Sequence, residues 1–140
     1  MKTKQNKTKQ KKERILSIIV SLFQFSKGQS RLRLLAKFVD DDYEKVDRIV
    51  ELHFEYFSKV QNAIQKIEQR KKEIIENDEE IDDEKQLEFD SMKLDGGFLS
   101  LQFIDLIILY ICTYEDDITV FISFFFLFLF LFHFSHSNAN

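Results

Sequence analysis

The apolar positions between residues 40 and 67 follow the spacing of one long amphipathic helix. They recur at alternating intervals of four and three, which places them on one helical face: Val46, Val50, Phe57, Val60, Ile64 and Ile67, with His53 filling the gap in the series. Ile49, Leu52 and Phe54 widen the apolar surface beyond a narrow coiled-coil stripe. So broad a face must be covered by other helices.

Both ends of this helix carry recognisable signals. Asp41 is a candidate N-cap residue, and Glu44 stands three residues further on, which is the spacing of a capping box. At the other end the pattern extends beyond Ile67 and predicts an end near Ile75.

The preceding residues predict two shorter helices. An apolar run, Ile15 to Phe25, is expected to end near Gly28, a plausible C-cap residue, and Ser30 can cap a second helix that reaches Val39. Two helices followed by a longer third helix are typical of an armadillo- or HEAT-like α-solenoid. Residues 15–112 are therefore predicted to form one armadillo-like helical region.

The segment from Phe98 to Cys112 predicts a further buried helix. It follows a break at Asp95, Gly96 and Gly97, and it is apolar on most sides. Asp105 is the exception, and we expect its carboxylate to face a polar neighbour or the edge of the packing.

Composition supports an all-α fold. The 140 residues include no proline and only three glycines, whereas the tight turns of β-rich folds need both. The single cysteine, Cys112, excludes an internal disulfide and a cysteine-based zinc site.

Charge is sorted along the chain. Residues 2–14 carry seven Lys or Arg against one Glu, and we interpret residues 1–14 as a basic disordered arm. Such an arm is a solvated tail, or else a nuclear-import signal or weak phosphate contact.

An acidic segment follows the long helix. Residues 76–90 contain nine Asp or Glu and one Lys, which predicts a mobile acidic loop or a frayed helix. It is either solvated surface or an electrostatic contact for a basic peptide. The candidate contact residues are Asp78, Glu79, Glu80, Asp82 and Asp83.

Residues 113–140 form a Phe-rich hydrophobic tail. Ile118 to Phe134 is 17 residues long and uncharged, so it predicts a hydrophobic helix at the short end of the membrane-spanning range. Its Phe and Leu alternation is also of low complexity. The tail is therefore a membrane anchor or the artefactual ending of a truncated gene model.

Catalytic and cofactor motifs do not appear in the sequence. It has no phosphate-binding Gly-rich loop, metalloprotease motif, EF-hand or nucleophile elbow. His133 and His136 have a metal-compatible spacing but no third ligand nearby. His53 fits a satisfied core or interface residue better than a catalyst. We expect no enzyme activity, cofactor or metal site.

Two blocks of residues resemble a known family. LLAKF, EKVDR and ELHF-x-Y, from Leu34 to Tyr56, and LDGG, at Leu94 to Gly97, are similar to the C-terminal armadillo region of the beta-catenin-like protein 1 family. The resemblance covers about residues 15–112. Family members are several times longer, so it implies a truncated member that lacks most of the repeats.

The resemblance implies a non-catalytic nuclear scaffold. Members join a spliceosome-associated complex in pre-mRNA splicing and bind basic nuclear-localisation-type segments of partner proteins, and no direct nucleic-acid contact is expected. The alternative is a small tail-anchored membrane protein with a cytosolic helical domain, in which residues 118–134 form the anchor.

Overall fold

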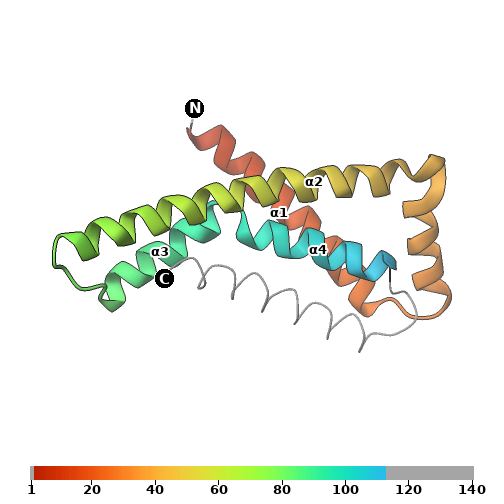
Figure 1. The fold of residues 1–140 in the computed structure, drawn as a ribbon. Helices are drawn as coiled ribbons and strands as arrows, with labels where there is room; N and C mark the ends of the chain where they lie inside the picture. Colours follow the sequence, from red (N-terminus) through yellow and green to blue (C-terminus); the bar gives the residue numbers. More distant parts are fainter. Residues whose placement is uncertain (1, 113–140) are drawn as a thin grey trace.

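The computed structural model describes residues 2–112, and this part of the chain is all-α, with four helices and no strand. These are α1 (Lys2–Phe25), α2 (Gln29–Glu76), α3 (Asp83–Asp95) and α4 (Phe98–Cys112). The long arm of α2 spans the molecule, α3 and α4 run back along it one after the other, and α1 crosses α2 and α4 obliquely (Figure 1). The all-α prediction and the long central helix are confirmed.

Helix α2 consists of two arms that meet at a sharp bend (Figure 1). Asp40 is extended, with ψ 162°, and the next three residues, 41–43, are left-handed, with φ between 54° and 64°. The expected division into a short helix and a long helix is therefore present. The expected cap at Asp41 is wrong, because an N-cap residue is extended whereas Asp41 has φ 54° and ψ 51°.

The start of α2 also differs from the expectation. The helix begins at Gln29 directly after Gly28, which has φ 59°. Ser30 therefore lies inside the first turn and is not the cap. Glycine is suited to this position because a left-handed backbone has no steric cost without a Cβ.

The hydrophobic core lies where α1, α2 and α4 meet. Leu101, Ile104 and Ile107 of α4 are fully buried, and so is Phe23 of α1. The Phe23 ring stacks on Tyr110 with a centroid distance of 5.4 Å and an interplanar angle of 8°. Each buried side chain of this size contributes roughly 1.5–3 kcal/mol through the hydrophobic effect, so this cluster is a large source of stability.

The buried face of α2 is rotated slightly from the predicted one. Val60 and Ile67 are buried as expected, but Val50 is 39% exposed. Ile49 and Tyr56 lie beside the predicted line and are among the most buried residues of the helix. The rotation follows from the position of α4, which packs along that side.

Residues 2–14 are helical, so the prediction of a disordered basic arm is wrong. Lys and Gln are good helix formers, and this segment is continuous with the buried turns at Leu16, Val20 and Phe23. In addition, the Lys9 Nζ donates a hydrogen bond to the Asp95 carbonyl oxygen. The buried turns that follow it and the hydrogen bond of Lys9 together keep this basic segment helical.

The acidic segment 76–90 is likewise more ordered than predicted, since only residues 77–82 are non-helical. Helix α3 is held to α2 by Phe89, which is 2% exposed and lies beneath the Lys71 ammonium at 5.5 Å from its ring centroid. Arg70 and Glu88 form an ion pair at 3.0 Å between the same helices. The buried aromatic ring and the ion pair together hold a strongly acidic helix against α2.

Within residues 2–112, no helix is by itself long and apolar enough to cross a bilayer. Helices α3 and α4, bent by 51° at their junction, meet the length and composition criteria as a pair. The hydrophobic tail, residues 113–140, lies outside the described residues.

Candidate partner-binding site

The predicted contact residues gather in one turn, which we call the acidic turn (residues 78–83). It connects α2 to α3 at one end of the molecule (Figure 1). All five candidate side chains are exposed, namely Asp78, Glu79, Glu80, Asp82 and Asp83. The structure therefore places them together on an accessible surface.

The turn begins with a Schellman-type ending of α2. Asp78 is left-handed, with φ 56°, and its N–H donates to the Ile75 carbonyl at 3.1 Å. The Glu79 N–H donates to the Ile74 carbonyl at 3.0 Å. These bonds satisfy carbonyl groups that a helix end otherwise leaves unpaired, so the first half of the turn has a defined shape.

The turn ends with an N-cap for α3. Asp82 is extended and its Oδ1 accepts a hydrogen bond from the Lys85 backbone N–H at 2.8 Å. Asp83 and Glu84 occupy the first helical turn, where the positive end of the helix dipole favours carboxylates. Asp82 therefore has a structural role as well as a negative charge.

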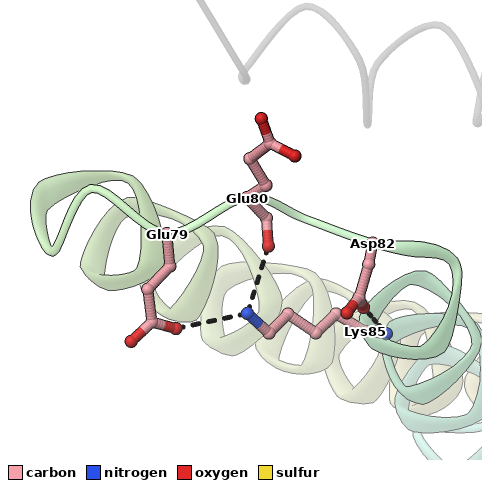
Figure 2. Close-up of polar contacts among 4 residues, drawn as sticks. All are labelled: Glu79, Glu80, Asp82 and Lys85. Atoms are coloured by element: carbon pink, nitrogen blue, oxygen red, sulfur yellow. Dashed lines mark hydrogen bonds and ion pairs between the residues drawn. The ribbon is translucent and has the colours of Figure 1, made fainter.

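One lysine crosses the acidic turn. Figure 2 shows the Lys85 ammonium between Glu79 and Glu80: Nζ lies 3.2 Å from Glu79 Oε2 and donates to the Glu80 carbonyl oxygen at 3.1 Å. The carboxylate of Glu80 points away from Lys85. The lysine therefore fixes the backbone while neutralising one acidic side chain.

Three carboxylates of the turn have neither an ion-pair partner nor a hydrogen-bond donor among the described residues: Asp78, Glu80 and Asp83. They are exposed and close in sequence, on a backbone that is fixed at both ends. Several like charges on a short ordered turn create a local negative potential that attracts cations. This surface is suited to Lys and Arg side chains of a partner.

A second polar site lies where α2 packs on α4. His53 Nδ1 is 2.5 Å from Asp105 Oδ1, and the two side chains are 29% and 6% exposed. The His53 ring also stacks on Phe57 at a centroid distance of 5.8 Å. The expectations that His53 is a satisfied interface residue and that Asp105 faces a polar neighbour are both confirmed.

Burial raises the pKa of the Asp105 carboxyl, and the hydrogen bond and charge of His53 act in the opposite direction. Beside the pair is a shallow apolar hollow of about 320 Å³, bordered by Val50, Phe54 and Ile108. Among the described residues that border this hollow, His53 and Asp105 are the only polar side chains. The geometry of the pair suits a structural contact.

Residues 2–112 contain no group of three or more His, Cys, Asp or Glu side chains that is arranged to hold a metal ion. Cys112 is a free, exposed thiol at the end of α4. The two histidines noted for their spacing, His133 and His136, lie outside the described residues.

A protein-family model described as "Catenin-beta-like, Arm-motif containing nuclear" matches residues 1–126. The chain belongs to this family. Among its relatives is beta-catenin-like protein 1 of Mus musculus, which is 45% identical over 104 residues. The Homo sapiens protein of the same name is 43% identical over the same length. The match covers 74% of this chain and 18% of each relative.

Membership of the catenin-beta-like family confirms the resemblance seen in the two sequence blocks. The family is described as nuclear and as containing Arm motifs, in agreement with an all-helical chain. The pairing of His53 with Asp105 was not predicted, although each was singled out as a polar residue on an apolar helix face. Two such residues on helices that must pack together are a signal that could have suggested the pair.

Proposed function

We propose that this catenin-beta-like chain acts as a non-catalytic interaction module of a nuclear assembly for pre-mRNA splicing, and that its acidic turn binds basic segments of partner proteins. Family membership supports the nuclear setting. The observation that carries the binding proposal is the exposed set of unpaired carboxylates at Asp78, Glu80 and Asp83.

The mechanism is electrostatic. Lys and Arg side chains of a partner segment approach the unpaired carboxylates, and a second basic side chain can compete with Lys85 for Glu79. A single exposed ion pair contributes only about 0.2–1 kcal/mol, so several must form together. The helical frame restricts the motion of the turn, which lowers the entropy lost on binding.

The test is to remove the unpaired charges while keeping both caps. The acidic-turn variant carries Asp78→Asn, Glu80→Gln and Asp83→Asn, and it leaves Asp82 and Glu79 in place. A matched control carries Glu44→Gln, Asp47→Asn and Glu73→Gln, which are exposed positions on α2. Both variants change the net charge by the same amount.

Binding is measured with a lysine- and arginine-rich peptide of the nuclear-localisation type. We expect roughly tenfold weaker binding for the acidic-turn variant and less than about a twofold change for the control. Affinity should also fall with added salt, because these charges are exposed. Equal losses in both variants would show that only net charge matters and would refute the assignment to the turn.

The tail-anchored alternative depends on the uncharged segment Ile118 to Phe134. It predicts that the chain stays with membranes after carbonate extraction and that deletion of residues 118–134 releases it. Release of the intact chain by carbonate would exclude a bilayer anchor.

A further inference from the structure

A basic pocket lies where α1 crosses the junction of α3 and α4. It has a volume of about 460 Å³ and is lined by four lysines: Lys4, Lys9, Lys12 and Lys59. Asp95, Gly96 and Gly97 also line it. The pocket exists because residues 2–14 are helical, since a disordered arm would not hold these lysines in place.

The lysines come from two helices, α1 and α2. Lys4 and Lys12 are two helical turns apart on α1 and therefore share a face. Lys9 is fixed to the Asp95 carbonyl oxygen, and the Lys59 ammonium lies 4.8 Å from the centroid of the Tyr56 ring. The positive charges thus converge from α1 and α2 on one concave surface.

The charge balance of the pocket favours an anion. Four lysines line the pocket together with one acidic residue, Asp95, and the Lys59 ammonium also forms an ion pair with Glu55 at 3.3 Å. The pocket also reaches Gly97, which directly precedes α4, and the N-terminal end of that helix adds partial positive charge. Gln5 and Thr8 supply neutral polar groups. A cavity of this size admits a ligand larger than a single inorganic ion.

We propose that this pocket binds a phosphorylated segment of a partner protein. Lysine ammonium groups are compact point charges that suit phosphate. A single-stranded nucleic acid would need exposed aromatic rings for base stacking. Among the described residues that line the pocket, the only aromatic side chain is Tyr56, and it is 4% exposed. The site is separate from the acidic turn and does not depend on the function proposed for it.

The experiment uses the full chain and a fluorescent peptide with two phosphoserines, followed by anisotropy. The pocket variant is Lys4→Gln with Lys12→Gln. The matched control is Lys7→Gln with Lys11→Gln, which removes the same charge from α1 at residues that do not line the pocket. Glutamine and lysine have similar helix propensities, and circular dichroism melts verify that both variants keep the fold.

We expect roughly tenfold weaker binding of the phosphopeptide to the pocket variant and less than about a twofold change for the control. The unphosphorylated peptide should bind weakly to all three proteins. Equal losses in both variants would overturn the proposal, because they would show attraction to α1 as a whole. Equally tight binding of a peptide with glutamate at both positions would overturn the requirement for phosphate.

A single-stranded RNA oligonucleotide of equal charge serves as the competing probe. Weaker binding of RNA than of the phosphopeptide supports the proposal. Tighter binding of RNA, lost equally in the pocket and control variants, would instead identify α1 as a nucleic-acid contact and overturn it.

Discussion

His53 on α2 and Asp105 on α4 are joined by a 2.5 Å contact between Nδ1 and Oδ1, at the edge of the apolar interface between the two helices. The carboxylate is nearly inaccessible to water, so its polar partner must come from the protein. Two residues that are exceptions to the apolar pattern of their own helices thereby satisfy one another. Their contact adds a polar link to the apolar packing between α2 and α4.

Replacing the histidine should destabilise the fold. In His53→Leu the buried Asp105 carboxyl loses its partner, and we expect unfolding to become easier by about 1–3 kcal/mol. Urea denaturation followed by circular dichroism measures this. The control His53→Leu with Asp105→Leu removes both polar groups and should recover much of the loss. A single variant as stable as the parent would show that the contact contributes nothing.

The raised pKa of Asp105 predicts a dependence of stability on pH. The carboxyl binds its proton more tightly in the folded chain, so its contribution to stability is present below about pH 4 and is lost as the pH rises through the higher folded pKa. As the pH rises from about 4 through the folded pKa of Asp105, the parent chain should therefore lose stability relative to Asp105→Asn. Urea denaturation of both proteins at several pH values measures the difference. If the parent chain instead became more stable relative to Asp105→Asn with rising pH, the predicted direction of the effect would be contradicted.

Gly97 should not tolerate alanine. Its φ is 96°, and a Cβ there would lie 2.9 Å from Tyr56 Cδ1, so both backbone and packing oppose the change. We expect Gly97→Ala to cost about 2 kcal/mol or more. Gly28→Ala is the control: Gly28 has φ 59° but no atom within 4 Å of the added Cβ, so only the backbone cost applies. Equal thermal shifts for both would contradict the close approach to Tyr56.

Asp78 offers a stabilising substitution. Its left-handed backbone, φ 56°, is unfavourable for a residue with a Cβ and favourable for glycine. We expect Asp78→Gly to raise the free energy of unfolding by about 0.5–1 kcal/mol. Asp78→Ala, which removes the charge and keeps the Cβ, should show no such gain in thermal denaturation. A gain of the same size with alanine would attribute the effect to charge instead.

The sequence alone was sufficient to predict structural features that depend on neighbouring residues in the chain. The helix from Phe98 to Cys112 follows directly from an apolar run after two glycines, and the end of α2 near residue 75 follows from the loss of periodicity. The acidic turn was found in the same way, since charge composition is visible without a structure. Whether its residues contact a partner stays a prediction.

Features with a tertiary cause were missed. The basic residues 2–14 were interpreted from charge alone, but a folded helix behind them and the Lys9 contact keep them helical. The His53–Asp105 pair joins residues 52 positions apart, so it depends on the register of two helices. The basic pocket requires α1 to cross Gly96 and Gly97, and no local pattern indicates that crossing.

The most direct measurement of the central claim is a nitrogen-15 NMR titration of the chain with a basic nuclear-localisation-type peptide. If the acidic turn is the binding site, the largest amide shift changes should fall on residues 78–85. These include the Lys85 N–H, which donates a hydrogen bond to Asp82 Oδ1. Addition of salt should reverse them. Shift changes that are absent from the turn, or that fall mainly on α1 or α4, would contradict the account.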